Sequence, residues 1–133
     1  MSGIKNLDAL LKSMKPEVVK GEFVFCTIIE EQFSKLKIVP LLIFHEKEGV
    51  TLILERKSAD KMKISYQNSC ALITLTVHSD LAAVGFLAAI TKTLAEKNIS
   101  VNAVSAYYHD HLFVPYEKKE QAMKALKETY SRR

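Results

Sequence analysis

The stretch from Ala71 to Pro115 shows the clearest changes of hydrophobic period in the chain. Its first residues alternate, and one side of the run is apolar: Ala71, Ile73, Leu75 and Val77. A period of two rich in β-branched residues predicts a strand. The apolar residues that follow recur at helical spacing: Ala83, Leu87, Ile90 and Leu94. We predict a helix here, with Ser79-Asp80 as its N-cap, because a side-chain oxygen there accepts a bond from an unpaired backbone N–H.

Two more strands and a helix are predicted after this long helix. Residues Ile99 to Ala106 form an apolar strand, Tyr107 to Asp110 a turn, His111 to Val114 a third strand, and Glu117 to Tyr130 a helix. This is the split βαβ order, in which the third strand lies between the first two and antiparallel to both. The loop His78 to Asp80, the start of the long helix and the turn should therefore meet at one edge of the sheet.

The first half of the chain repeats part of this order. We expect a helix Ile4–Met14 that ends at Lys15-Pro16, and then a strand Glu22–Ile29 that follows Gly21. One or two helical turns are expected within Glu30–Ile38. After them we expect a strand Pro40–His45, a turn Glu46–Gly49, a strand Val50–Glu55, and a helix that is capped by Ser58 and ends at Met62. The order strand, turn, strand, helix thus occurs twice. We predict an α+β protein of two parts, residues 1–66 and 67–133, with antiparallel sheets and helices packed on one face.

The segment VGFLAAITKTLAEKNISVNAVSAYYHDHLFV resembles an ACT domain, a small ligand-binding module attached to many enzymes of amino-acid metabolism. The likeness is to the ACT pairs of aspartate kinases and arginine-sensing proteins. The whole chain, from MSGIKNLDALLKSMKPE through GEFVFCT and EGVTLILE, resembles short stand-alone bacterial proteins built as two ACT-like halves. The resemblance implies two ferredoxin-like βαββαβ halves and a non-catalytic regulatory module. It also implies a small ligand, an amino acid, at the junction of the halves.

The expected ligand-binding residues lie on the loop before the long helix and on the facing hairpin: His78, Ser79, Asp80, Val84, Gly85, Ala106, Tyr107, Asp110 and His111. In the ACT pairs that bind amino acids, the glycine at the helix start lies beside the ligand, and Val84 replaces the proline that often precedes it. The arginine sensors carry an aspartate matching Asp110, whereas Ala106 stands where they often have threonine. Two alternatives stay open, that Gly85 serves close helix–strand packing and that Asp110 bonds only its own turn backbone.

A metal site is the runner-up from another class. His78, His109, Asp110 and His111 supply three imidazoles and a carboxylate, which are zinc ligands. The competing interpretation is a set of hydrogen-bonded or exposed histidines around a cleft. We expect no metal, no cofactor and no enzyme activity, because the sequence shows no P-loop, no G-x-S-x-G and no C-x-x-C. A third alternative is a dimerisation module without ligand.

Composition and charge bear on whether the chain binds nucleic acid, spans a membrane or is secreted. The chain has 133 residues, 48% hydrophobic and 26% charged, with a net charge of +4. The C-terminal lysines alternate with glutamates, which favours a solvated helix face over a nucleic-acid site. No apolar run approaches the ~20 residues that span a bilayer, and the N-terminus does not resemble a signal peptide. The chain has two cysteines, which we expect to be buried free thiols, so we predict a cytoplasmic protein. We also predict a homodimer that forms through exposed sheet edges.

Overall fold

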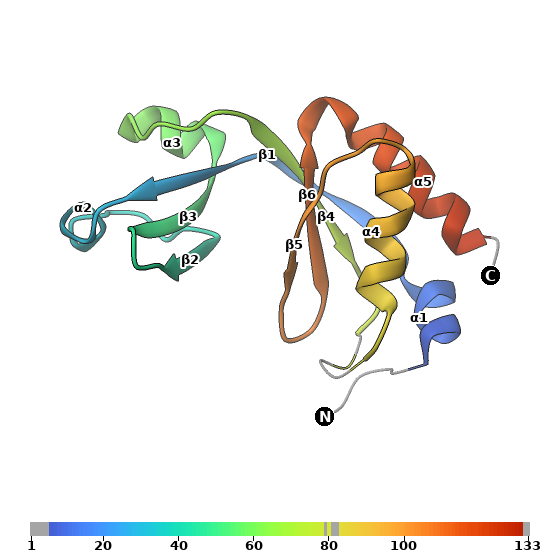
Figure 1. Cartoon of the computed structure of the whole chain (residues 1–133). Coiled ribbons are helices and arrows are strands. Elements are labelled where there is room, and N and C mark those ends of the chain that lie inside the picture. Colours follow the sequence, from blue (N-terminus) through green and yellow to red (C-terminus); the bar gives the residue numbers. More distant parts are fainter. Residues whose placement is uncertain (1–5, 79, 81–82, 132–133) are drawn as a thin grey trace. The chain divides into compact units, whose positions relative to one another are not determined.

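The computed structural model describes residues 6–78, 80 and 83–131. The chain forms two compact units. Unit 1 consists of residues 1–20 and 71–133, and unit 2 consists of residues 21–70. Figure 1 shows their elements in chain order: α1 (Leu7–Ser13), β1 (Pro16–Ile28), α2 (Glu30–Ser34), β2 (Leu42–His45), β3 (Val50–Glu55), α3 (Arg56–Met62), β4 (Ser69–Leu75), α4 (Phe86–Glu96), β5 (Asn102–Ser105), β6 (Asp110–Pro115), a 3₁₀ turn (Tyr116–Lys118) and α5 (Lys119–Ser131).

In unit 1 the strand order is β1-β4-β6-β5. The last strand of the chain, β6, therefore lies between β4 and β5, as the split βαβ order predicts. Strands β5 and β6 are antiparallel, and their register runs from Asn102 opposite Phe113 to Ser105 opposite Asp110. This register defines which residues reach the tip of the hairpin.

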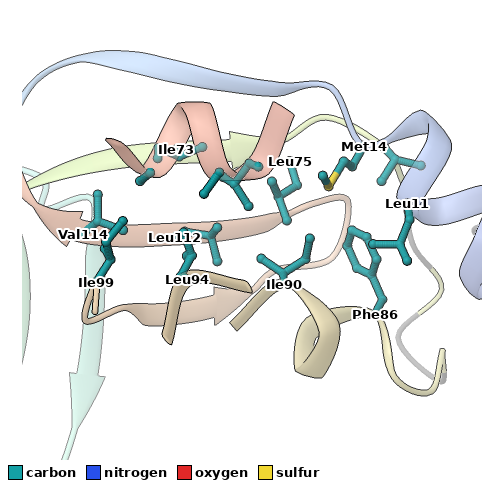
Figure 2. Packing of buried hydrophobic residues seen from close by; sticks show 14 of the residues in the cluster. Leu11, Met14, Ile73, Leu75, Phe86, Ile90, Leu94, Ile99, Leu112 and Val114 are labelled. Carbon is teal, nitrogen blue, oxygen red and sulfur yellow. The ribbon is translucent and has the colours of Figure 1, made fainter. Parts of the chain in front are cut away.

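Three helices cover one face of this sheet and form the core of unit 1 (Figure 2). The helix residues in the core are Leu10, Leu11 and Met14 at the N-terminal end, Phe86, Ile90 and Leu94 on α4, and Ala122, Ala125 and Leu126 on α5. Their spacing of three and four places them on one side of each helix. They pack against alternate residues of the strands, which include Ile73, Leu75, Leu112 and Val114.

The start of β1 differs from the prediction. The strand begins at Pro16, directly after α1, and not at Glu22. Lys15 has a left-handed φ of 35°, which breaks the helix. The backbone N–H of Thr76 then donates to the Met14 carbonyl at 2.8 Å, and its hydroxyl donates to the Lys15 carbonyl at 2.9 Å. These bonds hold the chain beside the end of β4, and Pro16 is tolerated because it is the first residue of the strand.

In unit 2 the strand order is β2-β3-β1, and both pairings are antiparallel. Helices α2 and α3 lie on one face, over a second apolar core: Val24, Cys26, Ile28, Val50, Leu52, Leu54 and Ala59. The predicted cap at Ser58 is wrong, because β3 runs straight into α3 and Glu55 is the N-cap residue.

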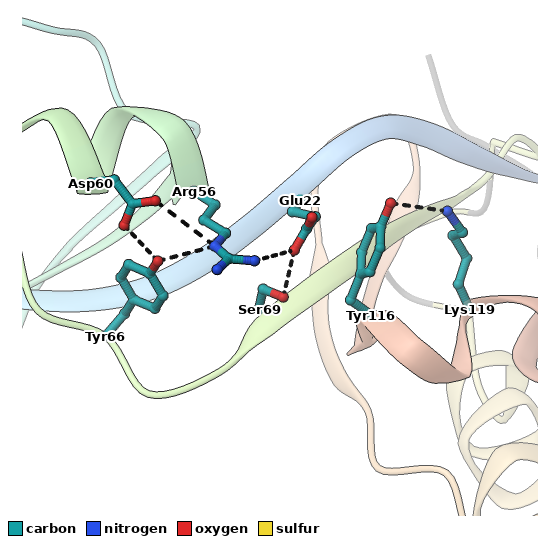
Figure 3. Close-up of polar contacts among 7 residues, drawn as sticks. All are labelled: Glu22, Arg56, Asp60, Tyr66, Ser69, Tyr116 and Lys119. Atoms are coloured by element: carbon teal, nitrogen blue, oxygen red, sulfur yellow. Dashed lines mark hydrogen bonds and ion pairs between the residues drawn. The ribbon is translucent and has the colours of Figure 1, made fainter.

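Polar contacts fix α3 to its neighbours within unit 2 (Figure 3). Arg56 donates to the Glu22 carboxylate at 3.0 Å and to the Tyr66 hydroxyl at 3.1 Å. Tyr66 in turn donates to Asp60 at 2.6 Å, and the Ser69 hydroxyl donates to Glu22 at 2.8 Å. One guanidinium therefore links strand β1, helix α3 and the segment that follows it.

Both units combine an antiparallel sheet with helices on one face, so the protein has the predicted α+β, ferredoxin-like architecture. The packing divides the chain differently from the predicted parts 1–66 and 67–133, because α1 lies in the core of unit 1 with the C-terminal half. The division at residues 66 and 67 stays a prediction about how two modules follow one another in sequence. No helix in the described part of the chain is long and apolar enough to cross a membrane.

Candidate functional site

The hairpin between β5 and β6 has a two-residue tip. Ser105 and Asp110 are the last paired residues of the ladder, and the Ala106 N–H donates to the His109 carbonyl at 3.0 Å. Only Tyr107 and Tyr108 lie beyond that bond, and both side chains are exposed. The turn is thus shorter than predicted, since Asp110 is the first residue of strand β6.

The loop after β4 lies against this tip through a cluster of rings. The His78 imidazole lies 6.4 Å from the Tyr107 ring and 5.5 Å from the Tyr108 ring, measured between centroids. The two tyrosine rings are 5.0 Å apart in an edge-on arrangement. These contacts agree with the convergence predicted from topology, because they bring the His78 loop and the hairpin to one edge of unit 1.

Asp110 is buried, with 6% of its surface exposed. The Ser105 hydroxyl donates to its carboxylate at 2.6 Å across the strand pair. A buried carboxylate needs such donors, because an unpaired one is costly to remove from water. The Ser105 hydroxyl is therefore one partner that offsets the cost of burying this carboxylate. Asp110 is the first residue of strand β6 and lies outside the two-residue tip; the alternative that it bonds its own turn backbone stays open.

His111 is half-buried, and its Nδ1 lies 2.9 Å from the Thr74 hydroxyl of β4. Burial lowers the pKa of this imidazole, the neighbouring His109 lowers it further, and Asp110 opposes both effects. The rings of His109 and His111 are 6.2 Å apart and edge-on, as expected for residues two apart in an extended strand. The lowered pKa favours the neutral ring.

The four candidate zinc ligands do not form a metal site. Among the residues that the structure describes, no three His, Cys, Asp or Glu side chains gather at a spacing that holds a metal ion. His78, His109, Asp110 and His111 all belong to the described part. Their contacts are instead ring packing and hydrogen bonds to neighbouring strands.

The start of the long helix differs from the prediction. Helix α4 begins at Phe86, and Gly85 is its N-cap residue in a left-handed conformation, with φ 92° and ψ −14°. The predicted N-cap at Ser79-Asp80 is wrong, because the helix begins six residues after Asp80. Ser79 lies outside the described residues, and the Asp80 carbonyl accepts a 2.9 Å bond from the Ala83 N–H. A Cβ added at Gly85 would lie 3.7 Å from Leu7 of α1, an ordinary contact. Conformation, and not close packing, therefore explains this glycine.

The N-cap residue of helix α4, Gly85, has no side chain that could cap the helix. The first N–H groups of any helix lack partners within the helix. They carry the positive end of the helix dipole, which attracts anions. Val84, immediately before Gly85, is 85% exposed. These two residues belong to the candidate site through their place at the helix start.

Sequence reasoning missed the roles of Thr74 and Ser105, and its predicted binding residues include Tyr107 but not Tyr108. Thr74 and Ser105 hold the two polar side chains of β6 in place, and Tyr108 contacts His78. The signal for Ser105 was available, because a two-residue hairpin tip at 107–108 pairs residue 105 with residue 110. The predicted turn extended two residues too far, to Asp110, and this concealed the pairing.

Comparisons with known proteins identify the family. Two models of the ACT domain match the chain, one over residues 2–71 and one over residues 67–128. A search of the curated proteins gives no match.

Solved structures agree with this family. A protein of unknown function from Vibrio cholerae, described as a possible transport protein, is 46% identical with a TM-score of 0.82, over 97% of this chain and 99% of that chain. The regulatory subunit of aspartate kinase from Thermus thermophilus, in a ligand-free form, is 10% identical with a TM-score of 0.67, over 89% and 98%. Aspartokinase III from E. coli, in complex with aspartate and ADP, is 14% identical with a TM-score of 0.61, over 86% of this chain and 32% of that chain. The chain therefore belongs to the ACT domain family and contains two ACT domains in tandem.

Proposed function

We propose that this protein is a regulatory module that binds a small molecule, an amino acid, at the edge of unit 1. The observation that carries the proposal is the packing of His78 against Tyr107 and Tyr108. It joins the loop that leads to α4 with the hairpin that bears Asp110, within a chain of two ACT domains. The predicted site residues are kept as the proposed binding site, with Ser79 outside the described part.

The two ends of an amino acid match the two charged features of this edge. The ligand carboxylate meets the first N–H groups of α4, which favour an anion. The ligand ammonium meets the Asp110 carboxylate. A neutral His111 beside Asp110 helps, because it does not repel the ammonium.

Regulation acts through another protein or through self-association in this proposal. We propose no catalytic residue, and we propose a homodimer as the working assembly. The placement of the ligand at the junction of the two halves stays a prediction.

A thermal-shift panel of the common amino acids tests the proposal. A ligand that binds only the folded state must raise the melting temperature. Aspartate is the first compound, because the E. coli aspartokinase III structure contains it. If none of the amino acids raises the melting temperature, the amino-acid proposal is wrong and the ligand-free dimerisation module takes its place.

Asp110→Asn is the variant that localises the site. If Asp110 pairs with a ligand ammonium, the variant should lose about 2–5 kcal/mol of binding free energy, as when one partner of a desolvated charge pair is removed. Ser105→Ala removes the hydroxyl donor yet keeps the charge, so it should retain most of the binding. Glu96→Gln, at the opposite end of α4, is the matched control for loss of one negative charge. Equal affinity of Asp110→Asn and the parent chain would refute the role of Asp110.

A further inference from the structure

Unit 2 contains a pocket of about 630 Å³ lined by residues of α2, α3 and the segments that follow them. Small-molecule pockets usually measure about 300–1,000 Å³ and are mainly apolar, with a few polar groups. Five apolar residues line this one: Ile28, Leu36, Ile38, Met62 and Ile64. All five belong to the core of unit 2 or pack against it. The pocket can thus remove an apolar chain from water.

The charged side chains that line the pocket are all positive. They are Lys35, Lys37 and Lys61, and no carboxylate lines the pocket. Lys35 has a partner, since its Nζ lies 3.6 Å from Glu31, with both side chains 74% exposed. The interaction free energy of such an exposed ion pair is small. Lys37 and Lys61 have no ion-pair partner among the residues that the structure describes.

Two acidic residues of these helices, Asp60 and Glu30, have partners that do not line the pocket. Asp60, next to Lys61 in sequence, accepts a 2.6 Å bond from Tyr66 and lies 3.9 Å from the Arg56 guanidinium. Glu30 at the start of α2 pairs with His45 at 2.8 Å. The lysines at the pocket therefore keep most of their positive potential.

Helix caps fix the walls of the pocket. At the end of α2 the Lys35 N–H donates to the Gln32 carbonyl at 3.1 Å. At the end of α3 Lys63 adopts a left-handed conformation, and the Ile64 N–H donates to the Ala59 carbonyl at 2.9 Å. These are common C-cap arrangements. They hold Leu36 and Ile64 in place without a ligand, so little ordering is left for binding.

We infer that this pocket binds a monocarboxylate with an apolar chain. The chain lies on the five apolar residues, and the carboxylate lies between Lys37 and Lys61. This site lies wholly in unit 2, so it is separate from the site proposed in unit 1.

Lysines near a helix C-terminus also offset the helix dipole, and this effect competes with ligand binding. A helix end carries at most about half a negative charge. Two such ends line the pocket beside three lysines, of which one, Lys35, is paired with Glu31. The positive charge is the larger, so the pocket attracts an anion.

An NMR titration of the ¹⁵N-labelled full chain with three probes tests the inference. Octanoate has both the chain and the charge, 1-octanol has only the chain, and acetate has only the charge. Octanoate should bind most tightly and shift the amides of Leu36, Ile38 and Ile64. In the double variant Lys37→Gln/Lys61→Gln, octanoate affinity should fall about tenfold while 1-octanol affinity stays the same, since each exposed pair contributes modestly.

Lys57→Gln is the matched control, because Lys57 lies on α3 yet does not line the pocket. It should leave octanoate affinity unchanged. The inference is overturned if octanoate and 1-octanol bind the parent chain equally, if the shifted amides lie in unit 1, or if Lys57→Gln weakens octanoate as much as the double variant. If the double variant loses stability with no loss of octanoate affinity, the lysines serve only the helix dipole and the inference is also overturned.

Discussion

Gly85 occupies a backbone conformation that most side chains disfavour. Its φ of 92° is left-handed, and it stands directly before the first residue of α4. A residue with a Cβ pays about 1–2 kcal/mol in this region. There is room for the methyl group itself, since the nearest atom would be 3.7 Å away. The expected penalty at this position is thus strain and not overlap.

Gly85→Ala should lower the free energy of unfolding by about 1–2 kcal/mol. Gly85→Asn should cost less, because asparagine visits the left-handed region more readily. Urea denaturation of the three proteins measures both differences. If alanine costs no more than asparagine, the left-handed conformation is not what selects glycine here.

His111 gives the protein a pH dependence with a defined sign. Its folded pKa lies below the ordinary value of 6.5, chiefly because of burial. Below about pH 6.5 the unfolded chain therefore binds a proton that the native chain resists. Stability contributed by the neutral ring is fully present above the unfolded pKa and is lost as pH falls through the folded pKa.

We expect the free energy of unfolding to decrease from about pH 7.5 to about pH 5, with His111 contributing at most about 1.4 kcal/mol per pH unit. His111→Gln should remove that share, so the difference between parent and variant should shrink on acidification. Urea denaturation at the two pH values measures it. A difference that is constant with pH would contradict this role of His111.

Among the elements, α1 is short yet central to unit 1. It has seven residues, and Leu10 and Leu11 have no exposed surface. The helix contacts both α4 and α5. So short a helix is marginal alone in water, so packing accounts for its stability.

Leu11→Ala should cost about 2–5 kcal/mol, the usual cost of a cavity at a buried leucine. Leu7→Ala on the same helix is the control, because Leu7 is 36% exposed and loses less contact. Urea denaturation measures both. A similar loss for the two variants would mean that α1 does not belong to the core.

Hydrophobic period predicted most elements, because most of the strands and helices have one buried side. It located β2, β3, β4, β6 and α5 to within a few residues. It predicted the first residues of several elements wrongly, because the backbone conformation of a single residue decides where such an element begins. The left-handed Lys15, the left-handed Gly85 and the direct passage from β3 to α3 leave little trace in an apolar pattern.

The candidate site was predictable as a set of segments. Strand order alone placed the His78 loop and the β5–β6 hairpin together. The partners Thr74 and Ser105 were not predicted, because they depend on the register of the hairpin. The pocket of unit 2 was not predicted either, since its residues come from three separate segments.

At the scale of the whole molecule, each end of the chain contributes to unit 1 while the middle forms unit 2. The turn at Glu46–Gly49 joins β2 to β3 and is closed by a 2.9 Å backbone bond between those two residues. A cut of the chain within this turn gives two fragments that share contacts in both units. In unit 2, β1 of the first fragment pairs with β3 of the second, and in unit 1, α1 of the first packs on α4 and α5 of the second.

Separate expression of residues 1–47 and 48–133 in one cell should therefore give two fragments that co-elute in size-exclusion chromatography. Placing Leu10→Asp and Leu11→Asp in the first fragment is the matched control, and it should reduce the co-eluting amount because it charges the core of unit 1. Independent elution of the unmodified fragments would contradict the interleaved packing.

The discontinuity of unit 1 also sets an order during synthesis. Residues 1–20 leave the ribosome before residues 21–70, yet their partners in unit 1 are residues 71–133. All core residues of unit 2 lie between them, so this unit has its complete sequence earlier. Synthesis proceeds at roughly 5–20 residues per second, so the apolar side of α1 stays exposed for several seconds. Helix α1 is thus made before unit 2 and buried after it, and in that interval its leucines are open to chaperones.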